Sequence, residues 1–107
     1  MDNVHPYLRP VEIENSFKLK RSHDEVIAEI LTLDALRNAI EAVPDSVISF
    51  HLDGRNDFAD WIREVIGCNT LSKAIAEVEL KPENPEETRK RILELLDYTI
   101  DLLKETA

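Results

Sequence analysis

The sequence predicts a mostly helical α+β fold, with a short N-terminal β-hairpin followed by four or five helices, the last one long. Three observations lead to this fold class. Apolar and polar residues alternate after Phe17, helical spacing with capping residues begins at Thr32, and the longest helical pattern follows Asn84. The predicted parts of this single domain, residues 1–107, are an extended arm at 1–15, a core at 17–78 and a C-terminal helix at 85–105.

The composition is that of a soluble, folded protein. Hydrophobic residues make up 43% and charged residues 33% of the chain, and two glycines and five prolines are too few for a disordered chain. A net charge of −9 repels the phosphates of nucleic acids and anionic lipids, so we expect no nucleic-acid and no membrane partner. Cys68 is the only cysteine and the N-terminus has no signal-peptide pattern, which together predict a cytoplasmic protein.

The hairpin prediction concerns residues 17–30. Positions 17–20 alternate between apolar and lysine side chains, and after a polar turn β-branched residues are mixed with polar ones. A single helix from Asp24 through Val43 is the competing interpretation, because the apolar residues also fit a helical stripe. We favour the hairpin because Thr32, followed by Leu33 and an aspartate, makes a good helix start.

Two helical segments should follow the hairpin. Thr32 can cap a helix whose apolar residues recur at intervals of three and four, and Pro44 closes it. Asp45 can then cap the next segment. Residues 47–52 of that segment fit either a short helix or a strand, and no glycine or proline decides between them.

The segment from Asn56 to Gly67 is predicted to be one helix. Asn56 is a favoured cap, and Asp57 places a negative charge next to the positive end of the helix dipole. Gly67 can adopt the left-handed conformation that ends a helix. Trp61 belongs to the apolar face of this helix.

Two more capping patterns follow. Thr70 should cap a helix that extends to Val78. Before the last helix Asn84 is the predicted cap, and Glu87 stands where a capping box places its acid.

These segments resemble a functionally uncharacterised family of small prokaryotic domains over residues 17–78. The most specific part is the NDFxxWIxxVIG pattern from Asn56 to Gly67, with Leu71 after it. The chain departs from that pattern at Ser72, where relatives often have alanine. The resemblance favours a helix at 47–52, and it implies no established activity, so no catalytic residues follow from it.

A small-ligand or metal-sensing site is the alternative function that the sequence allows. It would use His51, Asn56, Asp57 and Trp61, but each of these residues also has a structural explanation as part of a helix and its cap. The acids lack the pattern of a calcium loop, and the histidines lack metal-ligand spacing with Cys68, so we expect no metal and no cofactor.

The C-terminal helix is the better functional candidate. Its apolar residues cover more than one stripe, which leaves Leu93, Ile100 and Leu102 at the margin for a partner or a second copy. The competing interpretation is that the helix only supports its own core. We therefore expect a cytoplasmic protein-interaction or regulatory module without catalytic activity, whose protein partner is unknown. We also expect a homodimer through this helix.

Overall fold

The N-terminal hairpin is confirmed in the computed structural model, which describes residues 4–105. Strands β1 (Phe17–Ser22) and β2 (Glu25–Ile30) are antiparallel, and Phe17 pairs with Ile30. Phe17, Leu19 and Ile30 are buried on one face, so the alternation seen in the sequence is that of a half-buried sheet. The competing interpretation of one helix from Asp24 through Val43 is wrong, because residues 25–30 form β2 and pair with β1.

Helices α1 (Leu33–Ala42) and α2 (Asp45–Leu52) follow. The predicted cap of α1 is confirmed, since the Thr32 hydroxyl accepts the Ala35 amide at 3.0 Å. The segment that could have been a strand is helical. Asp45, predicted as its cap, is instead the first residue of α2 after Pro44, and its carboxylate binds Arg89.

The segment predicted as one helix from Asn56 is divided in two. Asn56 does cap α3 (Asp57–Trp61), with its side-chain oxygen 3.0 Å from the Ala59 amide. The chain then widens into a π-helical turn, η3 (Ile62–Ile66), in which the Gly67 amide reaches the Ile62 carbonyl at 2.7 Å. Gly67 has a φ of 90°, which confirms the predicted left-handed end.

Helix α4 (Asn69–Ala76) starts before the predicted cap and ends before Val78. Thr70 lies inside its first turn, and Cys68 occupies the cap position without a side-chain hydrogen bond. The prediction of Thr70 as a cap was therefore wrong, since the left-handed Gly67 lets the chain turn into α4 without it.

Helix α5 (Pro85–Glu105) has the predicted bounds, and the Asn84 side chain accepts the Glu87 amide at 3.2 Å. The capping box is not formed. The Glu87 carboxylate pairs with Lys81 at 3.1 Å and does not reach the backbone N–H of Asn84, because that N–H donates to the Lys81 carbonyl.

The N-terminal arm is less extended than predicted. Residues 1–3 lie outside the described part, and two short 3-10 turns follow, η1 (Pro6–Leu8) and η2 (Ile13–Asn15). Leu8 is buried, and the Val11 amide donates to the Leu31 carbonyl at 2.9 Å. The arm is therefore docked on the core through Leu8.

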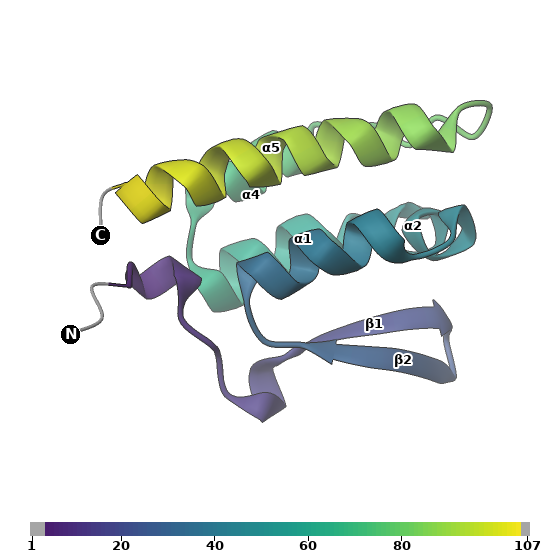
Figure 1. Ribbon diagram of the computed structural model, residues 1–107. Helices are drawn as coiled ribbons and strands as arrows, with labels where there is room; N and C mark the ends of the chain where they lie inside the picture. The colour runs from purple at the N-terminus through teal and green to yellow at the C-terminus, as the bar shows by residue number, and fades with distance from the viewer. Residues whose placement is uncertain (1–3, 106–107) are drawn as a thin grey trace.

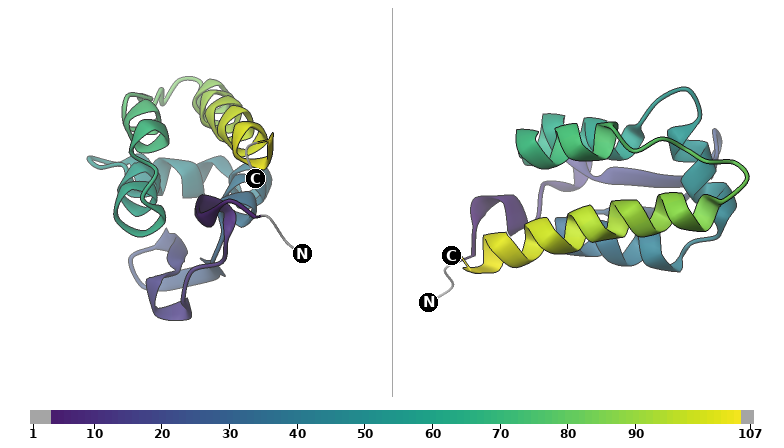
Figure 2. Two further views of the ribbon diagram at one scale, coloured as in Figure 1. Left: turned by 90° about the vertical axis from the view of Figure 1, so that its left-hand side faces the viewer. Right: turned by 90° about the horizontal axis from the view of Figure 1, so that it is seen from above.

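The elements form three levels, with the hairpin on one side, α1 and α2 in the middle, and α5 on the far side with α4 beside it (Figure 1). Seen along its length, the molecule has α4 and α5 next to each other at the top and the hairpin below (Figure 2). The arm and the end of α5 lie at the same end of the molecule. None of the helices within residues 4–105 is long and apolar enough to cross a membrane.

Candidate functional site

His51, the first residue of the predicted ligand site, is buried at 2% exposure, and both of its ring nitrogens form hydrogen bonds within the fold. Its Nε2 accepts the backbone N–H of Lys20 at 3.0 Å, and its Nδ1 lies 2.8 Å from a carboxylate oxygen of Asp57. Since Nε2 is an acceptor, the proton must be on Nδ1, which donates to Asp57. The imidazole therefore joins the hairpin to the start of α3.

Burial lowers the pKa of His51, and Asp57 opposes this shift only in part. We expect stability to fall as the pH drops below about 6.5, the ordinary pKa of histidine, because the unfolded chain then binds a proton that the folded chain excludes. The loss should continue until the pH reaches the lowered folded-state pKa. Urea unfolding across this pH range measures it.

His51→Gln should lack this component of the pH dependence. His23→Gln is the matched control because His23 is exposed and should leave the profile of the wild type unchanged. Equal acid sensitivity of His51→Gln and the wild type would contradict the neutral, buried imidazole.

Asn56 and Trp61 also have structural roles. The side-chain amide N–H of Asn56 donates to the Ile75 carbonyl at 2.9 Å, while its side-chain oxygen caps α3. The Trp61 indole N–H donates to the Asn15 carbonyl at 2.8 Å, and its ring is buried. Only His51 and Asp57 of the four predicted residues line a common hollow. Within residues 4–105 no three His, Cys, Asp or Glu side chains are grouped so that they could hold a metal ion.

The predicted interaction residues of α5 are only partly at the surface. Ile100 is 4% exposed and belongs to the domain's own core, so its assignment to the margin was wrong. Leu93 is partly buried against that core, whereas Leu102 is 42% exposed. Tyr98, which no sequence pattern singled out, is the most exposed of the large hydrophobic side chains within residues 4–105, at 68%.

Leu95, Tyr98 and Leu102 share one face of α5, because they follow one another at intervals of three and four residues. We call these three residues the α5 stripe. Leu95 is partly buried at its inner end, and exposure increases toward Tyr98 and Leu102. The spacing was visible in the sequence, but it could not show which of the apolar stripes of α5 the other helices leave uncovered.

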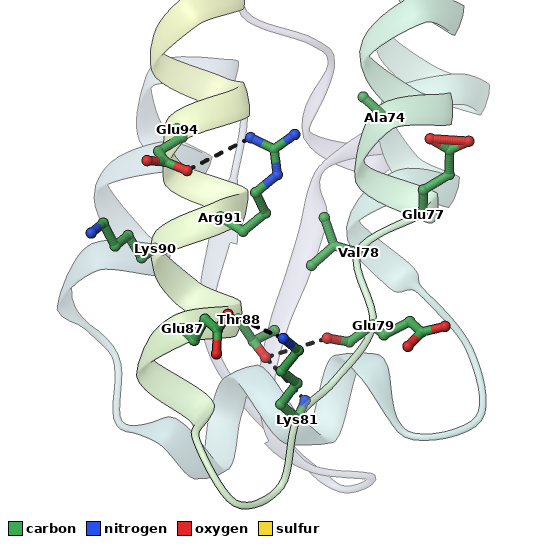
Figure 3. A pocket seen from close by; sticks show the side chains of 10 residues that line it. All are labelled: Ala74, Glu77, Val78, Glu79, Lys81, Glu87, Thr88, Lys90, Arg91 and Glu94. Carbon is green, nitrogen blue, oxygen red and sulfur yellow. Dashed lines mark hydrogen bonds and ion pairs between the residues drawn. The ribbon is translucent and has the colours of Figure 1, made fainter.

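A groove of about 560 Å³ lies between the end of α4 and the first half of α5 (Figure 3). Ala74 and Val78 form its apolar part on one side. On the other side the Arg91 side chain extends from α5 toward α4, while Lys90 points away (Figure 3). Thr88 is buried at the base of the groove.

Thr88 also holds the connection between the two helices in place. Its hydroxyl accepts the Lys81 amide at 3.0 Å and lies 3.4 Å from the Glu79 carbonyl, to which it can donate. The groove is therefore preformed at this end, with its width set by a buried contact.

Most of the charged side chains along the groove that have no ion pair are acidic. Arg91 pairs with Glu94 at 3.6 Å, and Lys81 pairs with Glu87. Glu77 and Glu79 belong to the opposite wall, and their carboxylates point away from α5 (Figure 3) without an ion pair to any residue in the described range. The groove can therefore accept apolar side chains at its base and cations along its α4 wall.

Comparison with known proteins gives one match. The family described as a family of unknown function (DUF5752) matches residues 14–106. No curated protein and no solved structure matches the chain. The expected likeness to an uncharacterised family is confirmed at this level, and the matched region extends past residue 78, where the expected likeness ended, to include α5.

Proposed function

We propose that this chain, which belongs to the family of unknown function DUF5752, is a non-catalytic protein-interaction module that binds an amphipathic helix of a partner protein. The binding surface consists of the α5 stripe and the groove between α4 and α5. The observation that carries this proposal is the exposure of Tyr98, with Leu102 one turn further on. An exposed aromatic beside a leucine is the kind of anchor that protein interfaces bury.

The two helices differ in length, and this shapes the surface. α5 has 21 residues and α4 has eight, which correspond to about 31 Å and about 12 Å of helix. α4 therefore accompanies α5 over only part of its length. A partner helix that lies in the groove could extend over Tyr98 and Leu102, the outer end of the α5 stripe. Its apolar residues would recur at the same intervals of three and four residues as those of α5.

Charge favours a basic partner. Glu94 and Asp101 flank the α5 stripe on the outer side, and Glu77 and Glu79 line the other wall. The whole chain carries a net charge of −9. We therefore propose a partner helix whose apolar stripe is bordered by lysine or arginine.

The sequence predicted a homodimer through Leu93, Ile100 and Leu102 of α5, and of these only Leu102 belongs to the α5 stripe. A homodimer on the α5 stripe itself would use the surface proposed here for a partner helix. An antiparallel pair centred on Tyr98 would place Leu95 against Leu102 of the second copy, but it would also place Glu94 near Asp101. This repulsion is the reason to propose a basic partner over a second copy.

The absence of catalysis and a cytoplasmic location are parts of the same proposal. His51 and Asp57, the best placed acid–base pair, already hold the hairpin against α3, which supports a structural role. The single cysteine, Cys68, is free and buried, which is the state of a thiol in a reducing compartment.

The test uses a synthetic helical peptide with leucines at alternating intervals of three and four residues and lysines beside them. A second peptide carries glutamates in place of the lysines. NMR titration should show saturable shifts near Tyr98 and Ala74 with the basic peptide and none with the acidic one. Tyr98→Glu should weaken binding by roughly tenfold or more, as expected for an anchor residue.

Val26→Glu is the matched control, because Val26 is also an exposed apolar residue but lies on the hairpin. It should leave peptide binding unchanged. Equal binding of both peptides, or full binding by Tyr98→Glu, would contradict the proposal. Light scattering of the chain without peptide tests the homodimer. A dimer that Tyr98→Glu dissociates would show that this surface binds a second copy of the chain and not a partner helix.

A further inference from the structure

A second hollow lies at the hairpin, away from the α4–α5 groove. It is formed where the hairpin meets the end of α2 and the turn that precedes α3. We call it the hairpin hollow, and its lining residues are Phe17, Lys18, Lys20, His23, Phe50, His51, Arg55 and Asp57.

The hairpin hollow is basic although the chain as a whole is acidic. Three cationic side chains line it against one carboxylate, that of Asp57. Lys18 is ion-paired with Glu29 at 2.7 Å and Arg55 with Asp57 at 3.0 Å, whereas Lys20 has no ion pair to any residue of the described range. Lys20 and Arg55 line the hollow together with His51, and their positive charges add to the effect of burial, which lowers the pKa of His51.

Arg55 is fixed in position by the surrounding chain. Its Nε donates to Asp57 at 3.0 Å, Nη1 donates to the Asp53 carbonyl at 3.2 Å, and Nη2 donates to the Phe50 carbonyl at 3.0 Å. The guanidinium also lies 4.8 Å from the centre of the Phe50 ring. Each Nη therefore keeps one N–H group for a ligand, and the group is already oriented.

Lys20 is fixed at its backbone. Its amide donates to His51, which places the start of its side chain beside the base of the hollow. A flexible ammonium and an oriented guanidinium thus face one space. This combination of a point charge and a planar donor is used to bind phosphate groups.

We propose that the hairpin hollow binds a phosphate group, held by Lys20 and the free N–H groups of Arg55. The ligand class is a small phosphorylated molecule or inorganic phosphate. This site is separate from the α4–α5 groove, so either proposal can fail alone. Of the residues predicted from the sequence for a ligand site, His51 and Asp57 belong here as supports, whereas Asn56 and Trp61 do not line it.

The test is an NMR titration of the full chain with inorganic phosphate, with sodium chloride of equal ionic strength as the reference. We expect saturable shifts of the Lys20 amide and the Arg55 side-chain N–H that chloride does not cause. Lys20→Gln should weaken binding by roughly tenfold, the usual effect of one charge-assisted contact. This variant keeps the backbone N–H, so the contact with His51 is retained.

Lys90→Gln is the matched control, since Lys90 is an exposed lysine on α5, and it should bind phosphate like the wild type. Glycerol phosphate distinguishes the two sources of the ligand: tighter binding than inorganic phosphate indicates a phosphorylated metabolite, and equal binding indicates phosphate itself. Shifts that chloride reproduces, or that Lys20→Gln leaves unchanged, would overturn the proposal.

Discussion

Trp61→Ala is expected to lower the free energy of unfolding by about 3 to 5 kcal/mol, the largest effect that we predict for a single substitution. The indole is 7% exposed and packs edge-on against Phe17, with ring centres 5.9 Å apart. The substitution opens a cavity between α3 and the hairpin. It also leaves the Asn15 carbonyl without the donor that reaches it at 2.8 Å.

Urea unfolding measures this loss. Trp61→Phe keeps most of the volume but not the N–H, so it should cost only about 1 to 2 kcal/mol and separates packing from the hydrogen bond. Tyr98→Ala removes an exposed ring and should cost less than about 0.5 kcal/mol. An unchanged unfolding midpoint for Trp61→Ala would return Trp61 to the candidate ligand residues.

Arg89→Ala should cost about 2 to 4 kcal/mol, because a buried donor serves several acceptors at once. Its Nη1 donates to the carbonyls of Ile40 and Val43 at the end of α1, and its Nη2 binds Asp45. Without the guanidinium these carbonyls lose their partner next to the start of α5.

Two comparisons test this account in the same urea experiment. Arg89→Lys should recover only part of the loss, since one ammonium cannot serve both sides of the planar group. Arg91→Ala is the control on the same helix and should cost less than about 0.5 kcal/mol, because its ion pair with Glu94 is exposed. Similar losses for Arg89→Ala and Arg91→Ala would contradict the role of Arg89.

The sequence predicted those features that depend on neighbouring residues. Thr32, Asn56 and Asn84 cap helices through contacts three residues away, and each contact is formed. The hairpin was predicted because alternation of side chains is local. The bounds of α5 follow from a cap, a proline at the first position and a sustained apolar period.

The remaining features depend on residues that are far apart in the chain. Arg89 reaches Ile40 across 49 positions, and Trp61 reaches Asn15 across 46. No local pattern shows such pairs, so the role of Arg89 was not predicted and Trp61 could be considered for a ligand site. The margin of α5 was misjudged for the same reason, since only the packed structure shows that Ile100 is covered and Tyr98 is not.

The anchoring of α5 is unequal along its length, and this has a consequence for amide hydrogen exchange. Arg89 and Thr88 fix its first turns through buried contacts, whereas the pair of Lys104 with Asp34 near its end is exposed, at 3.6 Å. Local opening should therefore start at the C-terminal turns, and their amides should exchange faster than those near Ile92. The outer end of the α5 stripe lies in this faster part, so a bound helix would slow exchange there most.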